Sequence, residues 1–202
     1  MEPIVFVVDD DAAARASVEN LLHSVGLRVQ SFDSALKFLE HGAPNVPSCL
    51  VLDVRLPRMS GIELQRELGL RGISIPIIFI TGHGDIPMSV EAMKAGALEF
   101  LVKPFRGQVL LDAIHKAIER DRAARNEQAR VAELRGRFDS LTPREREVMN
   151  GVIAGKLNKE IAAELGAAER TIKVHRASVM RKVGAESLAE LVRLSEKAFS
   201  PH

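Results

Sequence analysis

The chain has 202 residues, of which 46% are hydrophobic and 27% are charged, and its formal net charge at pH 7 is +1. This composition is typical of a globular protein with one or two domains and argues against a disordered chain. The sequence contains no apolar run of about eighteen residues, so we expect no membrane-spanning helix.

The first apolar stretch and the single cysteine indicate where the protein works. No basic residue precedes the stretch at Ile4–Val8, which ends in three acidic residues, so we expect a strand rather than a signal peptide. Cys49 is the only cysteine and opens another apolar run, which excludes a disulfide within the chain. We therefore expect a buried thiol and a cytoplasmic protein.

Residues 1–120 alternate short apolar runs with segments of helical length. The runs predict five strands, at Ile4–Val8, Arg28–Ser31, Cys49–Leu52, Ile77–Ile80 and Phe100–Val102. The segments between and after them predict five helices, at Asp11–Val25, Ser34–Glu40, Gly61–Leu70, Met88–Ala95 and Gly107–Ile118. Asp11, Ser34 and Ser60 are suitable N-caps, and Gly26 fits the end of the first helix. The pattern predicts an α/β fold with a doubly wound, five-stranded parallel sheet.

A polar segment follows this first domain. From Asp121 to Arg130 the residues are almost all charged or alanine, so residues 121–138 form either a solvated continuation of the last helix or a flexible linker. Every seventh residue from Ala117 to Phe138 is apolar, which permits a weak helix–helix seam through Ala124 and Val131.

Residues 139–202 show only helical patterns. Thr142-Pro143-Arg144-Glu145 is a capping box with proline at the first helical position. Asn158 is expected to cap a second helix, followed by helices at Glu169–Lys182 and Glu186–Phe199. We predict a small all-α domain of four helices, the second and third of which form a helix-turn-helix.

Polar residues follow four of the predicted strands. They are Asp9 and Asp10, then Asp53, Thr81 and Lys103. Because the carboxyl ends of parallel strands share one edge of a sheet, we expect these side chains to converge. Carboxylate oxygens suit Mg²⁺, and a carboxylate nucleophile, a divalent cation and a lysine are the parts needed to form an aspartyl phosphate.

The third helix of the second domain carries the strongest charge pattern. Between Arg170 and Lys182 there are five basic residues and no acidic one, which indicates contact with double-stranded DNA. The domain has no tyrosine or tryptophan on which single strands would stack. We expect DNA contacts from Lys159, Arg170, Thr171, Lys173, His175, Arg176 and Arg181.

The first domain resembles a response-regulator receiver domain. The resemblance rests on Val7-Val8-Asp9-Asp10-Asp11, Leu52-Asp53-Val54-Arg55-Leu56-Pro57, Ile80-Thr81-Gly82 and Lys103-Pro104-Phe105. It implies that Asp53 accepts phosphate from a sensor histidine kinase. It also implies that Mg²⁺ is held by Asp9, Asp10, Asp53 and the backbone carbonyl of Arg55. Lys103 would bind the phosphate, Thr81 and Phe100 would form the switch pair, and the Lys103–Pro104 bond would be cis.

The second domain resembles the LuxR-type helix-turn-helix of the NarL/FixJ family. The resemblance rests on Leu141-Thr142-Pro143-Arg144-Glu145-Arg146-Glu147-Val148, Asn158-Lys159-Glu160-Ile161-Ala162 and Thr171-Ile172-Lys173-Val174-His175-Arg176. Gly82-His83-Gly84-Asp85 and Val174-His175-Arg176-Ala177 are most similar to the FixJ branch, which includes StyR- and TodT-like regulators. One departure is Ala168, where the family usually has a capping serine; its loss weakens the helix start, and Glu169 partly offsets it.

Together the resemblances imply a bacterial two-component response regulator that binds promoter DNA. It would be no enzyme beyond its own phosphoryl transfer and dephosphorylation at Asp53. Its partners would be the sensor histidine kinase, promoter DNA, RNA polymerase and, on phosphorylation, a second copy as a homodimer. The family leans toward activation of transcription.

Plainer interpretations stay open for single residues. Asp9 and Asp10 complement a helix dipole in any protein, Thr81 and Lys103 fit an ordinary turn and surface, Phe100 fits a core, and His83 is expected to be a loop residue rather than a ligand. A rival function is a phosphohydrolase with an aspartyl-phosphate intermediate, but haloacid-dehalogenase-type enzymes carry a second aspartate where this chain has Arg55. A third possible function is a regulator that acts through protein contacts alone, but this function would not explain the basic residues between Arg170 and Lys182.

Overall fold

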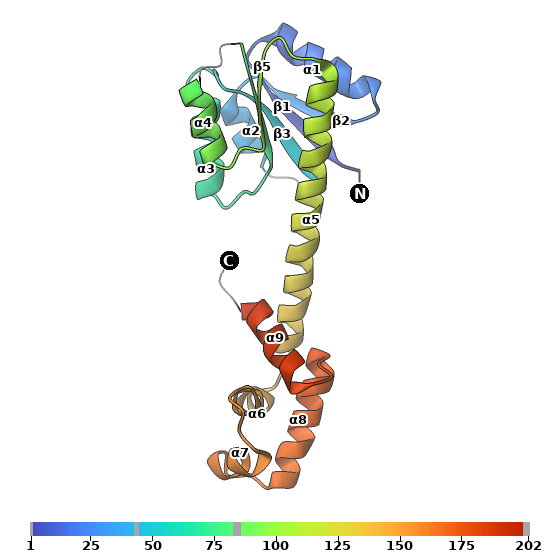
Figure 1. Ribbon diagram of the computed structural model, residues 1–202, viewed down its shortest axis with the longest axis vertical. Coiled ribbons are helices and arrows are strands. Elements are labelled where there is room, and N and C mark those ends of the chain that lie inside the picture. The colour runs from blue at the N-terminus through green and yellow to red at the C-terminus, as the bar shows by residue number, and fades with distance from the viewer. Residues whose placement is uncertain (1, 43–44, 83–85, 200–202) are drawn as a thin grey trace. The chain divides into compact units, whose positions relative to one another are not determined.

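The computed structural model describes residues 2–42, 45–82 and 86–199 (Figure 1). The chain divides into two compact units, Met1–Arg125 and Asn126–His202, which are described separately here. Among the described residues, no helix combines the length and apolar character that crossing a membrane requires.

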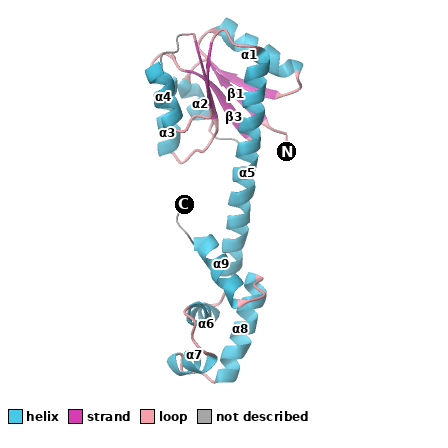
Figure 2. Cartoon of the chain, viewed as in Figure 1, coloured by secondary structure: helices cyan, strands magenta, loops and turns pink. Residues whose placement is uncertain are grey.

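The first unit is built on a parallel sheet, whose strands are magenta in Figure 2. The strand order is β2-β1-β3-β4-β5. Its strands are β1 (Ile4–Val8), β2 (Arg28–Phe32), β3 (Ser48–Asp53), β4 (Ile77–Thr81) and β5 (Glu99–Val102). Its helices are α1 (Ala12–Ser24), α2 (Ala35–His41), α3 (Gly61–Leu70), α4 (Ile86–Lys94) and the first part of α5 (Gly107–Asp139). The predicted doubly wound α/β fold is confirmed, with the strand order of the flavodoxin type.

Helices cover both faces of this sheet, which is why its strands are apolar on both sides. One face packs Phe6, Leu50 and Phe79 against α2, α3 and α4. The other packs Val7 and Val51 against α1 and α5. Cys49 lies in this second layer, and burial raises the pKa of its thiol. The predicted buried cysteine is therefore confirmed.

Helix α5 is much longer than its apolar pattern indicates. The sequence places its end at Ile118, whereas the helix continues unbroken to Asp139. The polar part of the helix carries short ion pairs between successive turns, Arg122–Glu119, Arg125–Asp121 and Arg137–Glu133. Of the two interpretations of residues 121–138, helical continuation is therefore the one observed.

The sevenfold repeat along α5 does not form one seam. Ala117 is buried in the core of the first unit, and Phe138 is buried in the core of the second unit. Ala124, between them, is exposed. Within the chain, the two ends of the repeat therefore belong to two separate cores.

The second unit packs four helices and the end of α5 around a single apolar core that includes Val148, Ile161, Ile172 and Leu191. The helices are α6 (Pro143–Ile153), α7 (Asn158–Glu164), α8 (Glu169–Val183) and α9 (Leu188–Phe199). The predicted all-α domain of four helices is confirmed.

Two cap predictions in this unit have different outcomes. The box of Thr142 and Glu145 forms at the start of α6. Asn158 was expected to be the cap of α7 but is its first helical residue, and Leu157 occupies the cap position. The Leu157 backbone N–H donates to the Glu160 carboxylate at 2.7 Å instead, so the first turn is closed from Glu160.

Candidate functional site

Three side chains from three strand ends meet at the carboxyl edge of the sheet. Lys103 Nζ lies 2.7 Å from Asp9 Oδ2 and 3.4 Å from Asp53 Oδ1. Asp9 directly follows β1, Asp53 ends β3, and Lys103 directly follows β5. The side chains of Asp9 and Asp53 are only 1% and 9% exposed, so these two residues and Lys103, together called the acid pocket, form a largely buried ionic cluster.

The second oxygen of each carboxylate is held by a backbone N–H. Asp53 Oδ2 accepts from the Arg55 amide at 2.9 Å, and Asp9 Oδ1 accepts from the Asp11 amide at 2.9 Å. Arg15 also donates to the Asp9 carbonyl at 2.6 Å and so fixes the loop between β1 and α1. Asp11 itself caps α1 by accepting the amides of the next turn, as predicted.

Gly61 lets α3 approach the acid pocket closely. A Cβ atom at this position would lie 2.4 Å from the Asp53 carbonyl oxygen and 3.0 Å from the Phe79 ring. The Gly61 amide donates to the Val54 carbonyl at 2.9 Å. Sequence analysis did not single out this residue, although a glycine at the first position of a capped helix is a signal of close packing.

In the acid pocket, burial and the neighbouring charges shift the pKa values of Asp53 and Lys103 in opposing directions. Burial raises the pKa of Asp53; the positive charge of Lys103 lowers it and the negative charge of Asp9 raises it. Burial lowers the pKa of Lys103, but its hydrogen bond to Asp9 and the charges of both carboxylates raise it more, so the net direction is upward. The lysine therefore stays cationic beside the two acids.

The carboxylates at this edge of the sheet supply hard oxygen donors for a metal ion. Within residues 2–42, 45–82 and 86–199, no three or more His, Cys, Asp or Glu side chains are arranged to hold a metal ion. Asp10 is exposed, whereas Asp9 and Asp53 come together around one cation. Mg²⁺ in phosphoryl-transfer sites uses one or two carboxylates together with water and phosphate oxygens, so this pair of hard oxygen donors fits such an ion.

The remaining residues expected at the pocket come from β4 and β5. Thr81 ends β4 and is fully buried, and its carbonyl accepts the Lys103 amide at 2.7 Å. Phe100 is half-buried in β5, with its ring centroid 6.3 Å from that of Phe79. The Lys103–Pro104 bond is cis, as the resemblance implied. Of the stretch Gly82-His83-Gly84-Asp85, the residues His83, Gly84 and Asp85 lie outside the described residues.

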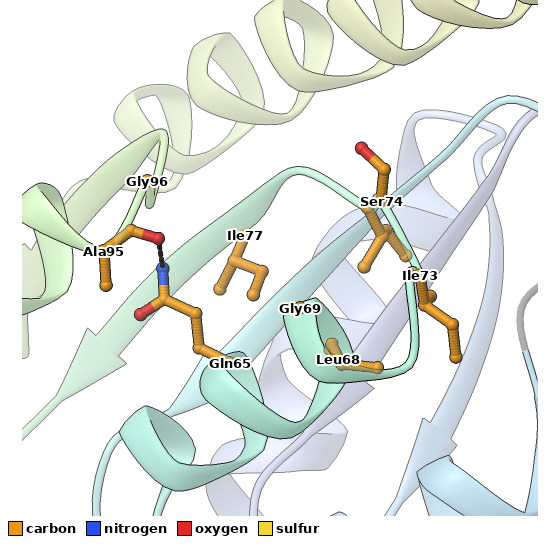
Figure 3. A pocket seen from close by; sticks show the side chains of 10 residues that line it. Gln65, Leu68, Gly69, Ile73, Ser74, Ile77, Ala95 and Gly96 are labelled. Carbon is orange, nitrogen blue, oxygen red and sulfur yellow. Dashed lines mark hydrogen bonds between the residues drawn. The ribbon is translucent and has the colours of Figure 1, made fainter. Parts of the chain in front are cut away.

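A hollow of about 310 Å³ lies at the amino end of β4, opposite the acid pocket (Figure 3). Gln65 lines it and donates to the Ala95 carbonyl at 3.1 Å, which ties α3 to the end of α4. None of the described residues around this hollow has an ionisable side chain. The acid pocket is therefore the stronger candidate for a chemical site.

The predicted DNA-contact residues lie on α7 and α8 of the second unit. Ile172 and Val179 of α8 are buried in the core, as the spacing predicted. His175 and Arg176 are half-buried, and Arg176 donates to Asn158 Oδ1 at 3.2 Å, which joins α8 to the start of α7. The exposed candidates are Lys159, Arg170, Thr171, Lys173 and Arg181.

Glu145 of α6 forms hydrogen bonds that hold the basic helix α8 against α6. Its carboxylate accepts hydrogen bonds from Lys182 Nζ and Ser178 Oγ, each at 2.7 Å, and from the Thr142 amide at 2.8 Å. The bonds from Lys182 and Ser178 lower the pKa of Glu145 to about 2. Sequence analysis identified Glu145 only as a capping residue, because its contacts with α8 depend on the tertiary fold.

The start of α8 lacks a side-chain cap. Ala168 occupies the N-cap position, and its methyl side chain accepts no hydrogen bond from the first turn. Glu169 is the acidic residue of that turn, as predicted.

Comparison with known proteins identifies the family. The model described as "Response regulator receiver domain" matches residues 5–115, and "Bacterial regulatory proteins, luxR family" matches residues 139–195. "Nodulation protein W" of Bradyrhizobium diazoefficiens is 58% identical over 193 residues, 96% of this chain and 85% of the relative. "Transcriptional regulatory protein FixJ" of the same organism is 47% identical over 195 residues, 96% of this chain and 95% of the relative.

A solved structure matches over both units. The structure of "Response Regulator StyR" is 53% identical, has a TM-score of 0.86, and the match covers 98% of this chain and 100% of that one. With its receiver domain and LuxR-type DNA-binding domain, the chain belongs to the two-component response regulators of the NarL/FixJ family, which regulate transcription.

Proposed function

We propose that Asp53 is the phosphoacceptor and that its phosphorylation controls binding of promoter DNA by the second unit. The observation that carries this proposal is the contact of Lys103 with both Asp9 and Asp53. It leaves one carboxylate at the end of β3 beside a fixed cation, which is the arrangement an incoming phosphoryl group needs.

The chemistry is a phosphoryl transfer. A carboxylate oxygen of Asp53 attacks the phosphorus of a phosphohistidine in the sensor kinase, a new O–P bond forms, and the N–P bond breaks. The electron pair of that bond stays on the imidazole, which then takes a proton. Lys103 neutralises charge on the transferred oxygens, because such reactions depend mainly on positioning and electrostatic stabilisation.

Asp9, Asp10, Asp53 and the Arg55 carbonyl would hold Mg²⁺ beside this group. When bound, the ion would neutralise and orient the phosphoryl oxygens. Hydrolysis of the acyl phosphate by water returns Asp53 to its free state. Apart from this cycle the protein is a regulator rather than an enzyme.

Thr81 and Phe100 would change conformation when Asp53 is phosphorylated. The Thr81 hydroxyl moves to the phosphoryl group, and the Phe100 ring turns inward. The surface of α4, β5 and α5 then favours a homodimer. Such a dimer presents two α8 helices to a site with approximate twofold symmetry, contacts RNA polymerase in the cytoplasm and activates transcription.

In the second unit, α8 would enter the major groove. Arg170, Thr171, Lys173, His175 and Arg176 would lie toward the bases and nearby phosphates, with Lys159 and Arg181 on the DNA backbone. We expect Lys173→Ala to weaken DNA binding at fixed salt. Lys197→Ala, which removes an exposed ion pair between α9 and Glu127 of α5, should leave the affinity unchanged. Equal affinity of Lys173→Ala and wild type would contradict this assignment.

The central test uses a DNA fragment selected from genomic fragments on the protein treated with acetyl phosphate and Mg²⁺. Affinity for this fragment is measured with and without acetyl phosphate for wild type, Asp53→Asn and Asp33→Asn. The control removes an exposed carboxylate that pairs with Lys37. We expect acetyl phosphate to raise the affinity of wild type and Asp33→Asn but not that of Asp53→Asn. A full response by Asp53→Asn would refute the proposal.

A further inference from the structure

Helix α5 is held to the first unit beyond the end of its apolar packing. Its last residues in the core are Ala117 and Ile118. From residue 119 to residue 130, all within the described part of the chain, only Asp121 is buried, and it is 4% exposed. A buried carboxylate thus occupies the position where the next turn of an amphipathic helix would carry an apolar residue.

Asp121 connects α5 to the strand that carries Asp53. Its Oδ2 atom accepts the Ser48 backbone amide at 2.8 Å and Arg125 Nε at 2.6 Å. Ser48 is the first residue of β3, and Asp53 is the last. Since β3 pairs with both β1 and β4, it is a rigid central strand. One end of it thus bears the candidate phosphoacceptor, and the other is bonded to α5.

These contacts are specific in a way that apolar packing is not. A buried charge is costly unless it is paired and hydrogen-bonded, so a carboxylate here constrains both the rotation and the register of the helix. The Ser48 backbone amide is a buried donor at the start of β3, and leaving it without the Asp121 carboxylate as acceptor would cost free energy. Ser48 Oγ is also buried and has no hydrogen-bond partner among the described residues.

We propose that Asp121 is a positioning residue that couples the two units: it fixes the polar turn of α5 to β3, and the phosphorylation state of the receiver reaches the DNA-binding unit through this fixed helix. The inference rests on the proposed function of Asp53. Two other ion pairs of residues 119–130, Arg122–Glu119 within the helix and Glu127–Lys197 to α9, are exposed and of the kind that contributes little to stability.

The test compares Asp121→Ala with Glu119→Gln in the full-length protein. Glu119→Gln is the matched control, because it removes the exposed Glu119–Arg122 ion pair of the same helix. Three quantities are measured: phosphorylation by acetyl phosphate, hydrogen exchange of amides 119–126, and the gain in affinity for the selected DNA fragment on phosphorylation. Asp121→Asn, which keeps an acceptor for the Ser48 amide, is the conservative variant and should restore part of the gain.

For Asp121→Ala we expect phosphorylation within about twofold of wild type, faster exchange over residues 119–126, and a gain in DNA affinity reduced about fivefold or more, as for a typical coupling between sites. The control should match wild type in all three. A full gain in Asp121→Ala, or unchanged exchange, would overturn the coupling role, whereas a wild-type protein that shows no gain would overturn the proposed function itself. If Asp121→Ala does not fold, Arg125→Gln is measured in its place. We then expect faster exchange over residues 119–126 and a smaller gain in DNA affinity, both weaker than for the loss of Asp121. Wild-type values of both for Arg125→Gln would count against the inference.

Discussion

Lys103 donates to Asp9 at 2.7 Å and to Asp53 at 3.4 Å, and so joins the ends of β1, β3 and β5 in one ionic cluster. The shorter bond is to the more deeply buried carboxylate, which holds the ammonium in place beside Asp53. This relationship explains how two buried acids lie together in the first unit. The lysine offsets their repulsion before any phosphoryl group arrives.

Replacing Lys103 by methionine should slow phosphorylation. We expect the rate of phosphoryl transfer from acetyl phosphate to fall at least about tenfold, because a cation that stabilises the transferred oxygens is lost. Intact-protein mass spectrometry over time measures this rate. Lys37→Met removes the exposed pair with Asp33 and should phosphorylate normally. Equal rates for both variants would mean that Lys103 has no part in the transfer.

Adding a methyl group at Gly61 should disturb the floor of the acid pocket. Because the new Cβ would lie 2.4 Å from the Asp53 carbonyl oxygen, Gly61→Ala should reduce the free energy of unfolding by about 1–3 kcal/mol. Gly69→Ala, in the same helix with open space around it, should instead stabilise by up to about 1 kcal/mol. Urea unfolding distinguishes the two, and a neutral Gly61→Ala would show that the close approach is not required.

Glu145 should make the second unit sensitive to acid. Its pKa is about 2 in the folded protein, below its usual value of 4.5, so the unfolded state takes up the proton first as pH falls. The stabilisation by Glu145 is therefore complete above about pH 4.5 and disappears toward pH 2. Glu145→Gln should be less stable than wild type at pH 7, and the difference should shrink over that interval.

Urea unfolding followed through the amide NMR signals of α8 measures this difference at each pH. Glu147→Gln, which removes the exposed pair with Arg144, is the control and should show little dependence on pH. If the difference in unfolding free energy between wild type and Glu145→Gln stays constant from pH 7 to pH 2, the ionised Glu145 carboxylate does not stabilise the second unit.

The missing cap of α8 can be restored. Ala168→Ser places a hydroxyl at the N-cap position and should stabilise the second unit by about 1 kcal/mol. Slower hydrogen exchange in the first turn of α8 would accompany this gain. Ala177→Ser, at an exposed position inside the same helix, should not stabilise, and an equal effect of both substitutions would exclude capping as the cause.

Most of the architecture could be predicted from the sequence because apolar runs mark the buried strands directly. The bounds of β1 and α3 agree with the prediction to the residue. The length of α5 could not be predicted in the same way. Its middle has no apolar face, and what holds it is a buried carboxylate and ion pairs between turns rather than a periodic pattern.

The candidate site shows a similar division. That Asp9, Asp53 and Lys103 meet follows from the rule that parallel strands end at one edge. Which member of the Asp9–Asp10 pair is buried does not follow, because it depends on how the chain leaves β1, and the structure buries Asp9. Gly61 and Asp121 were not identified from the sequence, and Glu145 was identified only as a capping residue, because these roles arise from contacts with distant segments.

The most direct test of the account is to locate the phosphoryl group itself. The protein is incubated with acetyl phosphate and Mg²⁺, the acyl phosphate is reduced with borohydride, and the modified residue is found by peptide mass spectrometry. We predict modification at Asp53 alone. Modification at Asp9, at Asp10 or at a residue outside the acid pocket, with Asp53 intact, would contradict the account.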